Sequence, residues 1–147
     1  MSPVHATTVT RRTRHGWRGV LLTGPSGAGK SDLAMRLIGA GWRLVADDYT
    51  GVWASDGALY ATAPAAIAGR IEARGLGILS RPAWPVTRVV LVVACGQAPV
   101  ERLPEPAFET VGGVVLPRLA LDTRPASAAA WVAAALDRAL APTAEQT

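Results

Sequence analysis

Hydrophobic and polar positions along this chain alternate in short blocks that predict a mixed α/β domain. Apolar or β-branched runs of strand length occupy residues 4–10, 19–23, 42–46, 50–54, 58–62, 88–95 and 114–121. Helical spacing places Leu33, Leu37 and Ile38 on one face of a helix over residues 31–40, which Gly39 and Gly41 end. A second, alanine-rich helix is expected over residues 126–140. Strands that alternate with helices favour the α/β class.

Turn residues divide these blocks. Residues 11–16 predict a polar turn between two strands, and Ser55-Asp56-Gly57 predicts a hairpin turn. Residues 64–69 suit one helical turn, whereas the proline-rich stretch 96–113 is expected to be a surface loop. We therefore expect a single domain over residues 1–147, with its core at 4–140 and a tail at 141–147.

Composition narrows the class of protein further. The net charge is +4, yet only Arg11, Arg12 and Arg14 cluster, which favours a solvated arginine-rich surface over a nucleic-acid partner. Neither a run long enough for a membrane span nor a secretory pattern is visible, so we expect a cytoplasmic protein without a membrane partner. Cys95, the sole cysteine, ends an apolar run and is interpreted as a buried, inert thiol.

Residues 24–31 carry the strongest chemical signal, because they match G-x-x-x-x-G-K-[ST] between an expected strand and an expected helix. Such a loop turns backbone N–H groups toward phosphate oxygens, while its lysine neutralises them and its serine ligates Mg²⁺. Lys30 is the only lysine of the chain, and a compact ammonium serves this position better than a guanidinium. The alternative is a glycine-rich turn that only resembles the motif. The predicted nucleotide-binding residues are Gly24, Pro25, Ser26, Gly27, Ala28, Gly29, Lys30 and Ser31.

Three further groups of residues are candidates on weaker grounds. Asp47-Asp48 follows an expected strand and could handle a metal or a phosphoryl acceptor, or could simply start a turn. Glu72 and Arg74 would share one face of a strand, where a surface ion pair is the alternative, and the glycines at 75 and 77 suggest close backbone approach. His5 and His15, taken alone, are each more often structural or surface residues than catalytic ones.

Taken together, three segments resemble the catalytic domain of the bacterial HPr kinase/phosphorylase family. They are Gly-Pro-Ser-Gly-Ala-Gly-Lys-Ser-Asp at 24–32, Arg-Leu-Val-Ala-Asp-Asp at 43–48 and Ile-Glu-Ala-Arg-Gly-Leu-Gly-Ile at 71–78. The last segment is similar to that family's signature, and the resemblance covers about residues 4–140. It implies a P-loop domain of the phosphoenolpyruvate-carboxykinase-like type, here in a short form without the family's separate N-terminal domain.

The resemblance also implies an activity and its partners. Members are ATP- and Mg²⁺-dependent protein serine kinases that phosphorylate HPr, the small phosphocarrier of the sugar phosphotransferase system. Many reverse the modification by phosphorolysis, and many are hexamers, so a homo-oligomer is expected here.

Individual positions match functional residues of the family. Lys30 and Ser31 match its phosphate-binding lysine and metal-ligating serine, and Glu72 matches its second metal ligand. Asp48 matches the catalytic acid/base. His5, in Val-His-Ala, matches an active-site histidine, and Arg102, in Glu-Arg-Leu, resembles a later catalytic arginine.

Two departures from the family's sequence pattern bear on the expected activity, and two alternative functions stay open. Asp32 replaces the family's glutamate, and the usual Pro-Val-Arg-Pro-Gly-Arg-Asn reads Asp-Thr-Arg-Pro-Ala-Ser-Ala at 122–128. Because that segment is tied to dephosphorylation in the family, we expect a kinase-biased enzyme. The alternatives are a P-loop enzyme acting on a small metabolite and a non-catalytic nucleotide-binding regulator.

Overall fold

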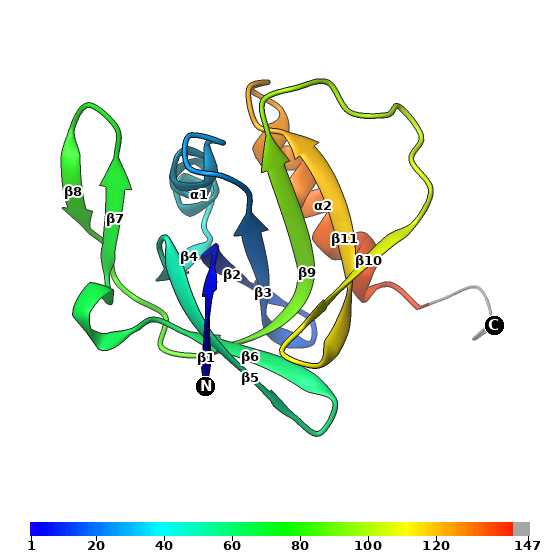
Figure 1. Ribbon diagram of the computed structural model, residues 1–147, viewed down its shortest axis with the longest axis horizontal. Helices are drawn as coiled ribbons and strands as arrows, with labels where there is room; N and C mark the ends of the chain where they lie inside the picture. The colour runs from blue at the N-terminus through cyan, green and yellow to red at the C-terminus, as the bar shows by residue number, and fades with distance from the viewer. Residues whose placement is uncertain (143–147) are drawn as a thin grey trace.

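Three parallel strands form the centre of the molecule in this computed structural model, which describes residues 1–142 (Figure 1). They are β3 (Gly16–Thr23), β9 (Thr87–Gly96) and β11 (Val114–Asp122), with β9 in the middle. The carboxyl ends of all three strands therefore lie at one edge of the sheet, which is where ligand sites of such sheets are found.

Antiparallel strands extend this centre on both sides. β2 (Thr7–Thr13) pairs with β3 and is followed outward by β4 (Arg43–Ala46), while β10 (Ala107–Val111) pairs with β11. The sheet also branches at β9, because β6 pairs with its first residues and β11 with its last. The branch consists of β6 (Ala58–Thr62), β5 (Tyr49–Ser55) and β1 (Ser2–His5).

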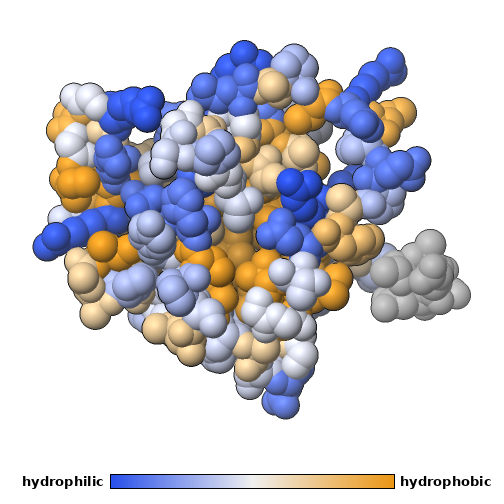
Figure 2. Space-filling view, viewed as in Figure 1, coloured by the Kyte–Doolittle hydropathy of each residue, from blue (hydrophilic) through white to orange (hydrophobic). Residues whose placement is uncertain are grey.

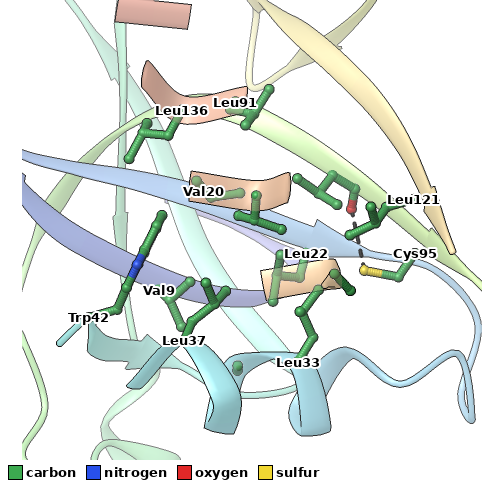
Figure 3. Packing of buried hydrophobic residues seen from close by; sticks show 14 of the residues in the cluster. Val9, Val20, Leu22, Leu33, Leu37, Trp42, Leu91, Cys95, Leu121 and Leu136 are labelled. Atoms are coloured by element: carbon green, nitrogen blue, oxygen red, sulfur yellow. Dashed lines mark hydrogen bonds between the residues drawn. The ribbon is translucent and has the colours of Figure 1, made fainter. Parts of the chain in front are cut away.

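Both helices, α1 (Lys30–Gly39) and α2 (Ala128–Leu140), pack against one face of the sheet. Side chains alternate along a strand, so Val20 and Leu22 of β3 reach the helices whereas Leu21 enters a second cluster on the opposite face. Figure 3 shows the helix-side cluster, in which Leu33 and Leu37 of α1 lie beside Leu22 and Val9. This core fixes the start of α1 directly after the end of β3.

A separate two-stranded sheet stands beside α1 and consists of β7 (Arg70–Ala73) and β8 (Gly77–Ser80) (Figure 1). A single 3₁₀ turn, Ala65–Ile67, leads into it. Ile71 of β7 is fully buried in the helix-side cluster, and Leu79 packs partly against that cluster. The tip of the hairpin is exposed, including Leu76 and Ile78.

Most of the expected elements are present, and the exceptions have local causes. The expected strand at 4–10 is two strands, since Ala6 separates β1 from β2 and sends them to different partners. The expected loop at 96–113 is wrong in its second part, because β10 forms there against β11. The Ser55-Asp56-Gly57 hairpin is confirmed, with left-handed backbone at Asp56 and Gly57. Of the predicted tail, residues 143–147 lie outside the described residues.

Apolar and polar groups are interspersed on the face seen in Figure 2, where apolar residues show through near the centre between polar ones. Among residues 1–142, no helix is long and apolar enough to cross a membrane. Cys95 is a buried free thiol, as expected, and burial raises its pKa to about 12.

Candidate active site

A cleft of about 780 Å³ lies at the carboxyl ends of the central strands. Its walls come from the loop 24–31 and the start of α1, from the β7–β8 hairpin, and from the segment after β11. The lining residues are Ser26, Gly27, Gly29, Lys30, Ser31, Asp32, Met35, Arg36, Asp48, Glu72, Ala73, Arg74, Gln97, Thr123, Arg124 and Ala126. The sequence-predicted loop, Asp48 and Glu72 are thus brought to one cleft.

The loop 24–31 needs its glycines for two reasons. Gly24, Gly27 and Gly29 have φ angles of 134°, 85° and 89°, which side chains disfavour. A Cβ on Gly24 would lie 2.5 Å from the carbonyl oxygen of Cys95, and one on Gly29 would lie 2.6 Å from Thr123 Oγ1. The loop therefore lies directly against the ends of β9 and β11.

The start of α1 presents unused N–H groups to the cleft. Its N-cap residue is Gly29, and no side chain caps the helix. Because the first N–H groups of a helix lack partners within the helix and carry partial positive charge, this end suits a phosphate group. The buried ammonium of Lys30 donates to the carbonyl oxygens of Gly24 (2.6 Å) and Pro25 (3.1 Å), which places its charge inside the curve of the loop.

Asp47 is the centre of a buried hydrogen-bond network. Its Oδ1 accepts from the hydroxyls of Ser31 (2.7 Å) and Thr7 (2.9 Å), and its Oδ2 accepts from the backbone N–H of Glu72 (2.9 Å). One carboxylate thereby connects the loop, β2 and the β7–β8 hairpin. A carboxylate bonded to the serine of a glycine-rich phosphate loop also occupies the position from which P-loop proteins hold Mg²⁺.

Asp48 points to the cleft instead of the interior. Its φ is 69°, and the N–H of Tyr49 donates to the carbonyl oxygen of Asp47 (2.8 Å), so a tight turn separates the two carboxylates. The Asp48 side chain is 61% exposed, and His5 Nε2 lies 2.9 Å from its Oδ1. A histidine on β1 therefore orients the carboxylate that the sequence predicts as the acid/base.

Glu72 and Arg74 do not form the ion pair that the sequence left open, judged over the described residues. Glu72 lines the cleft, and the Arg74 guanidinium lies 3.9 Å from where a Cβ of Gly27 would be, close to the loop. The glycines at 75 and 77 were expected to allow close approach. Within the described chain nothing approaches them, because a Cβ at either position would have no atom within 4 Å, and their positive φ values serve the hairpin turn.

Oxygen donors in the cleft fit a hard divalent cation. The Ser31 hydroxyl and the side chain of Glu72 line the cleft, and the buried Asp47 carboxylate hydrogen-bonds to the Ser31 hydroxyl and to the backbone N–H of Glu72. Among residues 1–142, no three acidic, histidine or cysteine side chains form a closed cluster. This sparse set suits Mg²⁺, which takes one or two carboxylates and completes its shell with water and substrate phosphates.

Some predicted site residues do not line the cleft: Gly24, Pro25, Ala28 and His5 stand next to residues that do, whereas Arg102 has no link to the cleft within residues 1–142. It is exposed on the loop between β9 and β10 and is absent from the lining. His15 lies in the β2–β3 turn, away from the cleft.

Sequence reasoning named Asp47 only as one of the pair Asp47-Asp48, and it missed Arg36, Thr123 and Gln97. Arg36 donates to the carbonyl oxygens of Thr123 (2.7 Å) and Pro125 (3.1 Å), which ties α1 to the segment after β11. In that segment Arg124 hydrogen-bonds to Asp122 and lowers the pKa of that carboxyl. The three missed residues belong to no motif in the sequence, whereas Asp47 was found by its position after the strand that follows the loop motif.

Comparisons with known proteins agree with this geometry. Residues 15–84 match the family described as HPr Serine kinase C-terminal domain. HPr kinase/phosphorylase of Clostridium novyi (strain NT) is 49% identical over 65 residues, which are 44% of this chain and 21% of that protein. The protein of the same name from Clostridium kluyveri is 52% identical over 61 residues, 42% of this chain and 20% of that protein.

The chain thus aligns with about a fifth of the length of these curated relatives. The solved structure of the Hpr(Ser) kinase/phosphatase from Coxiella burnetii is similar over 94% of this chain and 95% of that chain, with a TM-score of 0.79 at 22% identity. At this identity the likeness shows the mixed α/β fold. Residues 15–84 are thus similar in sequence to the HPr Serine kinase C-terminal domain family, and the chain shares the fold of one solved HPr kinase structure.

Proposed function

We propose that this chain is an ATP- and Mg²⁺-dependent protein serine kinase whose substrate is an HPr-like phosphocarrier. The observation that carries the proposal is the shared cleft, which joins the loop 24–31 to an exposed carboxylate held by a histidine. In this reading the loop is a P-loop of the phosphoenolpyruvate-carboxykinase-like type. Phosphoryl transfer asks mainly for positioning and charge stabilisation, and these residues supply both.

Each residue has a defined task in the proposed reaction. Lys30 and the N–H groups at the start of α1 bind the phosphates of ATP. Asp48 accepts the proton of the incoming serine hydroxyl, and its exposure allows a protein substrate to reach it. His5 holds Asp48 in place and can contact phosphoryl oxygens once they are bound.

Ser31 and Glu72 would hold Mg²⁺, with Asp47 orienting the serine hydroxyl. When bound, the cation neutralises charge on the β- and γ-phosphates. Arg102 has no part in this proposal, because it lies outside the cleft.

The exposed Asp48–His5 pair also favours an enzyme over a non-catalytic regulator. A nucleotide sensor needs the loop, but has no use for an oriented acceptor base on the open side of the cleft. A small-metabolite kinase would use the same groups, so the protein substrate must be tested directly.

The test is to incubate the protein with labelled ATP, Mg²⁺ and HPr from the same organism. We expect serine phosphorylation by the wild type and none by Lys30→Ala, whose binding of ATP should also weaken because the buried charge is lost. Transfer that persists in Lys30→Ala with unchanged ATP affinity would contradict the P-loop assignment. Turnover of ATP that does not depend on HPr would favour the small-metabolite enzyme.

The divergent segment 122–128 bears on the reverse reaction. Attack by inorganic phosphate brings two anions together, and Ser127 and Ala128 offer no cation there, while Arg124 is engaged by Asp122. We therefore expect phosphorolysis to be on the order of 10²-fold slower than phosphorylation. Mixing serine-phosphorylated HPr with enzyme, Mg²⁺ and phosphate and measuring pyrophosphate decides this, and comparable rates would contradict it.

A further inference from the structure

Thr123 is buried at the point where the segment after β11 meets the loop 24–31. It is 3% exposed, and its backbone N–H donates to the carbonyl oxygen of Gly96 at 3.0 Å. Its hydroxyl lies 2.7 Å from the carbonyl oxygen of Ala28, to which it donates, and 3.2 Å from that of Gly96. The residue therefore connects β9, β11 and the loop.

The hydrogen bond to Ala28 has a consequence for the next residue. In a trans peptide the C=O and N–H groups point in opposite directions. Since the Ala28 carbonyl is held toward Thr123, the N–H of Gly29 points the other way. None of the hydrogen bonds between described residues uses this N–H, and Gly29 lines the cleft.

The backbone of Gly29 packs directly against the side chain of Thr123. A Cβ at Gly29 would lie 2.6 Å from Thr123 Oγ1, so the loop and Thr123 are in direct contact. Because Gly29 has no side chain, its φ is little restricted and the 28–29 peptide can turn, so an external hydrogen bond is needed to fix its direction.

We infer that Thr123 is a positioning residue for the nucleotide site: its hydroxyl holds the Ala28 carbonyl away from the bound phosphates and so aims the Gly29 N–H at them. This inference rests on the proposed function, because it assigns the phosphates to the loop 24–31. Without the hydroxyl, the peptide samples orientations that present a carbonyl oxygen to an anion, and binding weakens.

Thr123→Val tests the inference, because valine keeps the shape and the backbone N–H but removes the hydroxyl. We expect the Kd for ADP and ATP to rise about tenfold while kcat at saturating ATP changes less than about threefold. Thr123→Ser should restore the affinity to within about twofold. Thr62→Val is the control, since the Thr62 hydroxyl also donates to a carbonyl, that of Pro85 (2.6 Å), and neither residue lines the cleft.

Hydrogen exchange of the nucleotide-free protein gives a second readout: the Ala28 N–H, which donates to the carbonyl oxygen of Pro25, should exchange faster in Thr123→Val than in the wild type or Thr62→Val. If the wild type binds nucleotide and Thr123→Val binds it equally well, the inference is overturned and the proposed function stands. If the wild type binds no nucleotide, the proposed function fails, and the role of Thr123 in affinity fails with it.

Discussion

The cleft has one wall that packs directly on the central sheet and another that belongs to a separate small sheet. The loop wall, residues 24–39, follows β3 directly and packs against β9, with its glycines in contact with Cys95 and Thr123. The hairpin wall, residues 70–80, is a two-stranded sheet of its own. Both walls carry residues proposed for the same reaction. The loop wall carries those for phosphate binding, and the hairpin wall carries Glu72 for metal binding.

The loop wall gains its order from the main core. Leu33 and Leu37 of α1 are buried in the helix-side cluster, and burying each such side chain contributes about 1.5–3 kcal/mol. The hairpin wall has one fully buried side chain, Ile71, and the hydrogen bond from the Glu72 N–H to Asp47. Local opening is therefore expected at the hairpin before the loop. The proposed phosphate site is preformed, whereas Glu72, the proposed metal ligand, depends on a more loosely held element.

Of the variants considered, Asp47→Asn should cause the largest loss of order in the hairpin wall relative to the loop wall. An amide cannot accept at both ends, so it either loses the bond from Glu72 N–H or places an NH₂ group against the hydroxyls of Ser31 and Thr7. The free energy of unfolding should fall by about 1–3 kcal/mol, and hydrogen exchange over residues 70–80 should accelerate by on the order of 10²-fold. Exchange measured by mass spectrometry and urea unfolding report the two effects.

Asp48→Asn is the matched control for this prediction. The Asp48 carboxylate is largely exposed and, among the described side chains, bonds only to His5, so the variant should lose transfer while keeping wild-type stability and hairpin protection. Equal loosening of the hairpin in both variants would show that Asp47 is not the specific link between the walls.

The sequence and the structure agree best where the pattern is local. The loop motif, the period of α1 and the Asp56-Gly57 turn each depend on neighbours in the chain, and all three are present. β10 was missed because its five residues follow a proline-rich stretch and gain strand structure only by pairing with β11. Propensity alone does not show such tertiary pairing.

The roles of the two aspartates show a second limit. Periodicity indicates that Asp47 and Asp48 point in different directions, but not which one enters the interior. The positive φ of Asp48 and the hydroxyls of Thr7 and Ser31 settle that, and these groups come from three separate elements. Thr123 was invisible for the same reason, since its partner Ala28 is 95 residues away in the chain.

Glu72→Gln should have an effect of intermediate size, limited to the Mg²⁺ concentration that the reaction needs. Replacing a carboxylate by an amide removes a charge from the Mg²⁺ site, and the concentration of Mg²⁺ for half-maximal transfer should rise about tenfold. The affinity for nucleotide in the absence of metal should not change, because the loop wall is untouched. Titration of activity with Mg²⁺, beside calorimetry with ADP alone, separates the two.

Glu109→Gln provides the control for general loss of an acidic group. Glu109 pairs with Arg118 on β10 and β11 and does not line the cleft, so its variant should keep the wild-type Mg²⁺ requirement. An equal shift in both variants would remove Glu72 from the metal site.

The smallest effect is expected at Cys95, which lies beneath the loop wall. The burial of its thiol can be tested by the pH dependence of the free energy of unfolding. Burial raises the pKa of this thiol to about 12 in the folded protein, against about 8.5 when it is exposed. The folded state favours the protonated form, so its contribution to stability is complete below about pH 8.5 and is lost as the pH rises toward 12.

Between pH 8 and 10 the free energy of unfolding should fall by about 1–2 kcal/mol more in the wild type than in Cys95→Ala. Urea unfolding of both proteins at the two pH values measures the difference. Equal losses in the two proteins would mean that the thiol also ionises in the folded protein. Cys95, which lies beneath the loop wall, would then be open to water.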